Sequence, residues 1–371
     1  MKRGTDRWAR LIAGEAQGAC DRLAVGGLRA LSVMYGGALA LHLAGYRIGL
    51  ARRTRLPALV VSIGNLTVGG TGKTTAAIAV ARWLTERGKR AAVLSRGYLA
   101  EGEGGTVVVS EGFGPLATVE AAGDEPYLLA QALPGVFVLA GKDRRKAGRL
   151  AVDKFGAEAL VLDDGFQYQR LVKDMDIALV DALAPFGYDF LLPRGLLREP
   201  PEHLARADAV WITHADLVRE TDLEPLRRKV QELAPGARVW EARHAAVRLR
   251  RLAEQEEVGP EALRGRRVLA LSSVGNPAAF ERSLEREGAV LVGRARFPDH
   301  HPYRPEELRD LTAGEGTSAE WIVTTEKDAV RLPVERLARP VWVMEVELAA
   351  REGWPSLGQE LSCLLEAKRK Q

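Results

Sequence analysis

The stretch GNLTVGGTGKTT, residues 64–75, lies between a run of apolar residues and a helical pattern. The run ALVVSI at 58–63 predicts a buried strand, and the spacing of apolar residues from Ala77 to Leu84 predicts a helix that ends at Gly88. A strand, a glycine-rich loop ending in Lys-Thr, and a helix form the context that a phosphate-binding P-loop requires. The alternative, a chance glycine-rich turn, would not explain these flanks. The stretch therefore predicts a nucleotide-binding α/β fold.

The residues of this loop have expected parts in holding ATP. Glycines let backbone N–H groups surround phosphate oxygens, and the helix N-terminus favours an anion. Lys73 is expected to neutralise the β- and γ-phosphates and to act in catalysis, and Thr74 to offer its hydroxyl to Mg²⁺. The strict motif has glycine where this chain has Thr67. The predicted ATP-binding residues are Thr67, Val68, Gly69, Gly70, Thr71, Gly72, Lys73 and Thr74.

A second apolar run, residues 159–162, ends in two carboxylates, Asp163 and Asp164. The carboxyl ends of parallel strands form the edge at which α/β sheets bind ligands. These acids are therefore predicted to hold Mg²⁺, directly or through water. The alternative is a pair of acids in an ordinary turn after a strand.

Composition restricts the class of protein. The chain has 371 residues, which predicts roughly two domains. With 46% hydrophobic and 27% charged residues it resembles neither a disordered chain nor a polytopic membrane protein. The two cysteines, Cys20 and Cys363, argue against a disulfide framework or a cysteine-rich zinc site. A net charge of +4 favours anionic partners but is too small to indicate nucleic acid, and we predict none.

Residues 30–46 contain no Asp, Glu, Lys or Arg, and Arg47, Arg52, Arg53 and Arg55 follow them. The stretch is short for a membrane span, which needs roughly 20 residues. An apolar helix beside arginines suits an anionic membrane surface. A cleaved signal peptide fits poorly, because the apolar region begins late and has no clear cleavage site. The alternative is an amphipathic helix packed on the globular body.

Apolar strands alternate with helical segments through the rest of the chain, which predicts a doubly wound, mostly parallel sheet. Its strands are expected at 58–63, 91–95, 136–140, 159–163, 176–181 and 208–213. A short Arg-rich strand at 247–252 is expected to lead into a second, smaller α/β unit with strands near 267–272, 289–295, 320–325 and 340–346. The predicted division is an N-terminal segment 1–55, a P-loop domain 56–245, and a lid or substrate domain 246–371.

Six motifs occur along the chain in an order that resembles a known family. They are GGTGKT at 69–74, GDEP at 123–126, DDGFQ at 163–167, LREP at 197–200, FPDH at 297–300 and TTEKD at 324–328. In this order they resemble the tetraacyldisaccharide 4'-kinase family of lipid A biosynthesis, over about residues 30–350. Two positions depart from the family's usual residues: Tyr168 stands where His is usual, and Thr75 where Pro is usual.

The resemblance implies a kinase that uses ATP and Mg²⁺. Its acceptor would be the 4'-hydroxyl of a tetraacylated glucosamine disaccharide 1-phosphate, and its product the bisphosphorylated precursor lipid IVA. It also implies that the apolar N-terminal helix dips into the cytoplasmic face of the inner membrane. The protein is therefore expected to be a peripheral or monotopic inner-membrane protein.

The resemblance also implies roles for residues outside the loop. Asp124 looks like the family's catalytic base and His300 like its histidine partner, although either could hold the proton. Asp124 could instead cap a helix, and the adjacent His301 competes with His300 for the histidine role. From the residues themselves, the expected metal ligands are Thr74, Glu125, Asp163 and Asp164. Arg144 and Arg198 could stabilise the transferring phosphoryl group or contact substrate, although a basic run is more often a solvated helix face. Asn65 and Arg96, in loops at strand ends, and Gln167 are further candidate substrate contacts.

Two other functions compete with this reading. A P-loop ATPase or GTPase that acts as a switch or metallochaperone would suit the loop, but GTP-selective proteins commonly carry Asn-Lys-x-Asp, and residues 325–328 are only a partial match. A non-catalytic, membrane-bound nucleotide-binding protein would not explain GDEP or an Asp–His pair.

Overall fold

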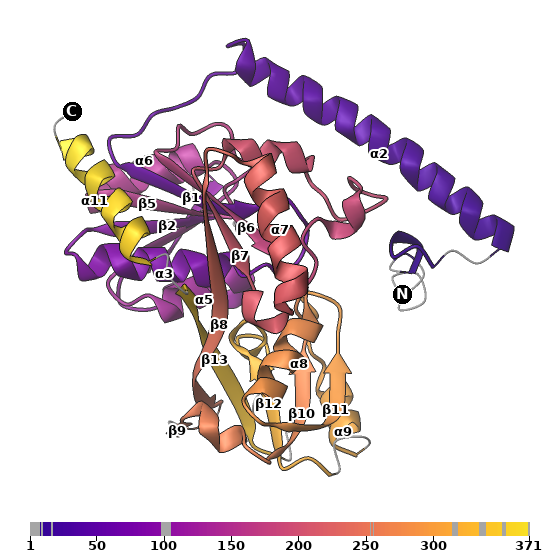
Figure 1. The fold of residues 1–371 in the computed structure, drawn as a ribbon. Coiled ribbons are helices and arrows are strands. Elements are labelled where there is room, and N and C mark those ends of the chain that lie inside the picture. The colour runs from indigo at the N-terminus through magenta and orange to yellow at the C-terminus, as the bar shows by residue number, and fades with distance from the viewer. Residues whose placement is uncertain are drawn as a thin grey trace.

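The structure is a computed structural model that describes residues 8, 10–15, 18–97, 105–252, 254, 256–313, 318–333, 339–350 and 354–369. Residues 1–7, 9, 16 and 17 of the predicted segment 1–55 thus lie outside the described residues. A long helix, α2 (Gly18–Arg47), precedes a globular body made of two α/β units (Figure 1).

The first unit, here called the P-loop unit, contains the glycine-rich loop at residues 64–75. Its elements are β1 Leu59–Asn65, α3 Lys73–Glu86, β2 Ala91–Ser95, β3 Thr106–Glu111, α4 Val119–Ala122, α5 Asp124–Ala132, β4 Phe137–Gly141, α6 Arg144–Phe155, β5 Ala159–Asp163, β6 Met175–Asp181, η2 Gly187–Asp189, η3 Pro201–Arg206, β7 Ala209–Thr213, η4 Ala215–Leu217 and α7 Glu220–Leu233. The strand order is β3-β4-β2-β5-β1-β6-β7, and each neighbouring pair is parallel except β3 with β4.

Strand β1 lies at the centre of this sheet between β5 and β6, and each of its seven residues is buried. A central parallel strand is covered on both faces, which explains its continuous apolar sequence. Helices α3, α5 and α11 (Trp354–Arg369) cover one face, and α6 and α7 cover the other. The predicted doubly wound, mostly parallel sheet is confirmed, and the edge strand β3 adds to the strands predicted.

The second unit is a smaller parallel sheet with helices on both faces. Its elements are η5 Pro260–Leu263, β10 Arg267–Ser272, α8 Pro277–Arg286, β11 Val290–Arg296, α9 Pro305–Ala313, β12 Trp321–Thr325, α10 Glu326–Ala329 and β13 Val341–Ala350. The strand order is β11-β10-β12-β13. The predicted second α/β unit is therefore present.

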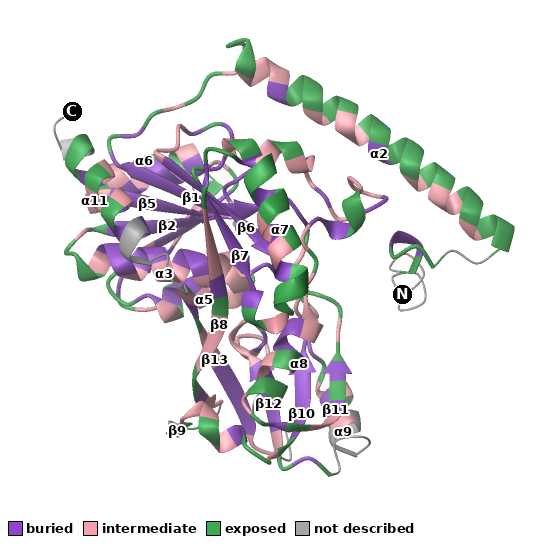
Figure 2. Ribbon diagram, in the orientation of Figure 1, coloured by how far each residue is buried: buried purple, intermediate pink, exposed green. Residues whose placement is uncertain are grey.

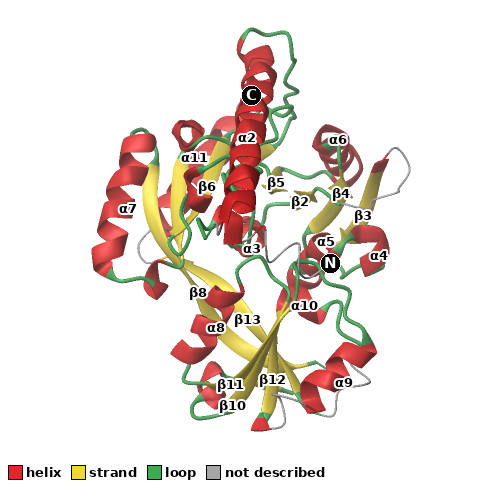
Figure 3. Ribbon diagram, turned by 90° about the vertical axis from the view of Figure 1, so that its right-hand side faces the viewer, coloured by secondary structure: helices red, strands yellow, loops and turns green. Residues whose placement is uncertain are grey.

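One long strand, β8 (Arg238–Arg251), belongs to both sheets (Figure 3). Its first residues pair in parallel with β7, and residues 242–251 pair antiparallel with β13. The short strand β9 (Glu257–Val258) lies against its end. The predicted connecting strand at 247–252 is the second half of β8, and the predicted border between residues 245 and 246 falls inside it. The division into domains stays a prediction.

Helix α2 extends beyond the globular body and is mostly exposed (Figure 2). Several of its large apolar side chains face outward: Leu23, Val33, Met34 and Leu41 are 70–78% exposed, whereas Leu43 is buried. The helix contacts the loop that contains LREP: Ser32 Oγ donates to Leu191 O at 2.7 Å, and Tyr35 OH donates to Arg198 O at 2.8 Å. Among the described residues it is the helix long and apolar enough to cross a membrane.

Candidate functional site

The phosphate loop ends where α3 begins. Gly72 holds the left-handed φ of 86° that glycine adopts readily, and Lys73 is the first residue of the helix. The Lys73 ammonium donates to Gly69 O at 3.3 Å and lies 3.9 Å from Asp164 Oδ1. Burial lowers the pKa of Lys73, against the pull of Asp164. The lysine thus folds over its own loop, as a phosphate-binding lysine must.

The loop is braced from both units. Asn65 is fully buried, and its amide donates to Thr71 Oγ1 at 2.9 Å. Thr213, at the end of β7, donates to Thr71 O at 3.1 Å. From the second unit, Gly275 packs so closely that a Cβ there would lie 2.5 Å from Gly70 N. Asn65 therefore supports the loop, and its predicted contact with substrate stays a prediction.

Two carboxylates leave the end of β5 beside this loop. Asp163 is buried, and its Oδ1 has no hydrogen-bond partner among the described residues. Burial raises the pKa of Asp163 to about 7, with Glu125 and Asp164 acting in the same direction. Asp164 would also have its pKa raised by burial, but Lys73 and Arg198 outweigh burial and lower it. The pair therefore divides into a carboxyl that binds a proton near neutrality and a carboxylate that stays ionised.

The residues predicted to hold Mg²⁺ fit such an ion. Among the described residues no three His, Cys, Asp or Glu side chains form a metal cluster by themselves. Mg²⁺ is usually held by one or two carboxylates together with water and substrate phosphates. A buried, unpartnered oxygen on Asp163, with Glu125 acting on it electrostatically, is the environment that a cation would relieve. Thr74 follows Lys73 in the first turn of α3.

The predicted pair of Asp124 and His300 is brought together by the two units. Asp124 opens α5 after Gly123, and His300 follows β11 in the second unit. His300 Nδ1 lies 2.9 Å from Asp124 Oδ2. The N-cap of α5 is Gly123, so Asp124 does not cap this helix, and the alternative role for Asp124 as a helix cap is wrong. The adjacent His301 bonds Glu307 at 2.8 Å instead.

Two cations that had no predicted role complete this cluster. Lys327 Nζ lies 3.1 Å from Glu125 Oε1, and Arg331 Nε lies 3.2 Å from Asp124 Oδ2. Burial alone would raise the pKa of Asp124, but the hydrogen bond with His300 and the charges of Arg331 and Lys327 lower it overall. The carboxylate of Asp124 is therefore ionised near neutral pH. The sequence places TTEKD directly after a strand of the second unit, but it does not indicate what Lys327 and Arg331 face.

Three of the predicted substrate residues, Arg198, Gln167 and Asn65, are linked to Asp164 by hydrogen bonds. Arg198 Nη1 donates to both Asp164 oxygens at 2.8 Å and lies 3.4 Å from Gln167 Oε1. Gln167 in turn donates to Asn65 O at 2.8 Å. Arg144 is buried at the start of α6 and lies over the Tyr168 ring at 5.2 Å. Arg96 lies just after β2 and is exposed. Their contacts with substrate stay predictions.

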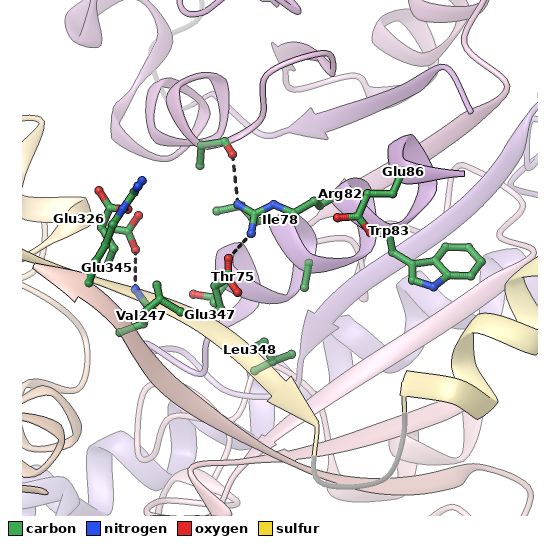
Figure 4. A pocket seen from close by; sticks show the side chains of 14 residues that line it. Thr75, Ile78, Arg82, Trp83, Glu86, Val247, Glu326, Glu345, Glu347 and Leu348 are labelled. Atoms are coloured by element: carbon green, nitrogen blue, oxygen red, sulfur yellow. Dashed lines mark hydrogen bonds and ion pairs between the residues drawn. The ribbon is translucent and has the colours of Figure 1, made fainter. Parts of the chain in front are cut away.

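A cavity away from this cluster is lined by residues of α3 and of the paired strands β8 and β13 (Figure 4). Its volume is about 480 Å³, and none of the predicted site residues lines it. Thr75, Arg82, Glu326 and Glu347 are among the residues that do. Burial raises the pKa of Glu326 to about 7, and its neighbour Lys327 reaches the Asp124–His300 pair. The cavity thus adjoins α10 without belonging to the site.

Several known proteins match this chain over most of its length. The family model described as Tetraacyldisaccharide-1-P 4'-kinase matches residues 26–365. A tetraacyldisaccharide 4'-kinase of Anaeromyxobacter dehalogenans (strain 2CP-C) is 50% identical over 296 residues, covering 80% of this chain and 78% of that protein. One of Geobacter metallireducens is 42% identical over 90% of this chain and 97% of that protein. The crystal structure of LpxK from Aquifex aeolicus in complex with ATP superimposes with a TM-score of 0.70 at 31% identity, covering 92% of this chain and 99% of that one.

Proposed function

The chain belongs to the tetraacyldisaccharide-1-P 4'-kinase family, and from this premise we propose how its own residues carry out the phosphorylation of a lipid A precursor. The donor is ATP and the acceptor is the 4'-hydroxyl of a tetraacylated glucosamine disaccharide 1-phosphate. The product is the bisphosphorylated lipid. Family membership leaves no support for the switch, metallochaperone or non-catalytic alternatives.

In this proposal the phosphate loop holds the triphosphate. Backbone N–H groups of residues 67–74 bind phosphate oxygens, and Lys73 neutralises the charge that gathers on the transferring phosphoryl group. Mg²⁺, when bound, neutralises phosphate charge and orients the nucleotide, and Thr74, Asp163, Asp164 and Glu125 would hold it. The buried, unpartnered Asp163 Oδ1 supports this assignment.

Asp124 accepts the proton of the attacking hydroxyl. Its carboxylate is ionised near neutral pH, and it lies at the start of α5, where the helix dipole favours negative charge. Both contacts with His300 and Arg331 involve Oδ2. We therefore assign proton acceptance to Oδ1, with His300 orienting the carboxylate through Nδ1. A carboxylate that pairs with a positioned imidazole is a recurring acid–base arrangement.

The acceptor's acyl chains remain in a membrane, and α2 is the element proposed to meet it at the cytoplasmic face of the inner membrane. Its outward apolar side chains and the arginines after it suit the boundary between acyl chains and anionic headgroups. Tyr35 links the helix to the backbone of Arg198, whose side chain bonds Asp164. This contact supports delivery of the sugar to the site from the membrane side.

The observation that carries the proposal is the Asp124–His300 pair, formed across two units beside the Lys73 loop. The test incubates the purified chain with ATP, Mg²⁺ and tetraacyl disaccharide 1-phosphate in detergent micelles. We expect a bisphosphorylated lipid, and no product from Lys73→Met. Absence of product from the folded wild-type protein, or equal product when the 4'-hydroxyl of the substrate is blocked, would contradict the proposal.

A further inference from the structure

Lys327 occupies the centre of the cluster between the two units. Its Nζ lies 3.1 Å from Glu125 Oε1, 3.3 Å from Asp299 Oδ1 and 3.3 Å from His300 Nε2. Its side chain is 20% exposed, whereas that of His300 is 47% exposed. The lysine therefore touches the imidazole on the nitrogen opposite the one that faces Asp124.

The position of Lys327 is fixed by the buried residue next to it. Asp328 is fully buried and accepts hydrogen bonds from Ser273 N at 3.0 Å and from Tyr303 OH at 3.0 Å. Arg331 Nη2 also donates to Asp328 Oδ1 at 2.9 Å. These bonds tie α10 to the end of β10 and to the segment after His300. The buried, hydrogen-bonded Asp328 thus fixes the backbone beside Lys327 and keeps Lys327 in contact with His300.

The chemistry of the two groups determines where the His300 proton lies. A lysine ammonium has three donors and no acceptor, so His300 Nε2 must accept in this contact. A neutral imidazole carries one proton, which is then on Nδ1. Nδ1 lies 2.9 Å from Asp124 Oδ2 and can donate to it. Asp299 Oδ2, at 3.9 Å from Nε2, is beyond hydrogen-bond distance.

We propose that Lys327 is a positioning residue that holds His300 as the neutral, Nδ1-protonated tautomer, so that His300 orients Asp124 and does not itself take the substrate proton. The proposal rests on the catalytic pairing proposed above, in which Asp124 accepts the proton. The ammonium beside Nε2 disfavours a second proton on the ring. Without Lys327, the ring would lie between two carboxylates, Asp124 and Asp299, which favour the doubly protonated form.

The test reads the tautomer directly by ¹⁵N NMR of histidine-labelled protein at pH 7. The chain has six histidines, and His300→Gln identifies the signals of His300 by their loss. In the wild type we expect one protonated nitrogen, Nδ1, and one unprotonated nitrogen, Nε2. In Lys327→Met we expect both ring nitrogens to be protonated, and in Lys327→Arg, which keeps a donor there, the wild-type pattern.

Lys89→Met is the matched control, because Lys89 is 11% exposed and pairs with Glu158 at 3.2 Å in a part of the P-loop unit distant in sequence from this cluster. It should leave the His300 signals unchanged. In the kinase assay, Lys327→Met should lower kcat by about 10- to 100-fold with little change in the KM for ATP, a part of the roughly 10²–10⁴-fold effect of general-base catalysis. Lys327→Arg should recover most of that loss.

Three results would overturn the proposal. They are a wild-type His300 protonated on Nε2, His300 signals unaltered by Lys327→Met, or a rise in the KM for ATP with kcat unchanged. If Lys327→Met does not fold, the wild-type tautomer still decides. The expected tautomers together with a lack of lipid product would instead refute the proposed function and leave this inference standing, because the NMR measurement does not depend on activity.

Discussion

The two sides of the site are built in different ways. The phosphate side comes mainly from one continuous segment, β1, the loop and the start of α3, where Lys73 contacts a carbonyl only four residues away. The proton-accepting side joins Asp124 to His300, which are 176 residues apart, and Glu125 to Lys327, which are 202 apart. Phosphate binding is thus a local property of the chain, whereas proton acceptance depends on how the two units meet.

The largest expected effect is on the local side. Lys73→Met removes the cation that neutralises the transferring phosphoryl group, and we expect turnover to fall by about 10³-fold or more. The measurement is kcat with ATP and the lipid acceptor, beside an ATP-binding titration. A loss below tenfold in protein of normal melting temperature would mean that another cation does this work.

Asp124→Asn tests the proton-accepting side, which depends on contacts between the two units. We expect kcat to fall by about 10²-fold or more, because an amide cannot take the proton. Binding of ATP should change little, since the loop is built without Asp124. Titration with a fluorescent ATP analogue and steady-state kinetics check both halves. Near-normal turnover would show that another group accepts the proton, and a large loss of ATP affinity would contradict the separation of the two sides.

The third effect concerns the free energy of unfolding, which the ionisation of the buried Asp163 lowers. The pKa of Asp163 is raised to about 7 in the folded protein, above the value of roughly 3.9 expected when unfolded. Between these values the unfolded chain releases the proton and the folded chain keeps it, so stability falls as pH rises from about 4 to 7.

Asp163→Asn, which never ionises, should therefore be more stable than the wild type by a few kcal/mol at pH 8 without metal, with little difference at pH 4. Urea unfolding at the two pH values measures this. Asp153→Asn, an exchange on the exposed side of α6, is the control. An equal effect of Asp163→Asn at both pH values would contradict the raised pKa.

The smallest effect probes the contact between the units. Gly275→Ala places a Cβ 2.5 Å from Gly70 N, and we expect a loss of about 1–3 kcal/mol in unfolding free energy through overpacking. We also expect a drop in turnover larger than that in ATP affinity, because His300 would be displaced from Asp124. Gly236→Ala is the matched control, since a Cβ there meets nothing within 4 Å. Equal effects of the two substitutions would show that the contact at Gly275 does not matter.

The sequence predicts the phosphate side of the site well and the proton-accepting side only in part. Residues 58–75 determine their own strand, loop and helix start, and buried runs locate most strands. Edge strand β3 had a usable signal in the β-branched run at 106–109. Pairing of Asp124 with His300 came from family resemblance, because no local pattern places α5 beside the segment after β11.

The roles of Lys327 and Arg331 lay beyond sequence reasoning for the same reason. Their spacing of four residues predicts that they share one side of a helical turn, but not what that side faces. Asn65 shows the converse: its position at a strand end suggests a ligand contact, yet its side chain turns inward to the loop threonines. Side-chain direction at a strand end depends on neighbours that are distant in sequence.

The packing of α11 on the P-loop unit has a consequence for the making of this protein. Leu357, Leu361 and Leu365 complete the same core as Leu84 of α3, although about 270 residues separate them along the chain. At a synthesis rate of roughly 5–20 residues per second, about 14–55 s pass between the synthesis of α3 and that of the α11 leucines that bury its face. During that time the nascent chain displays an apolar seam that chaperones can bind and that favours aggregation when synthesis outpaces them.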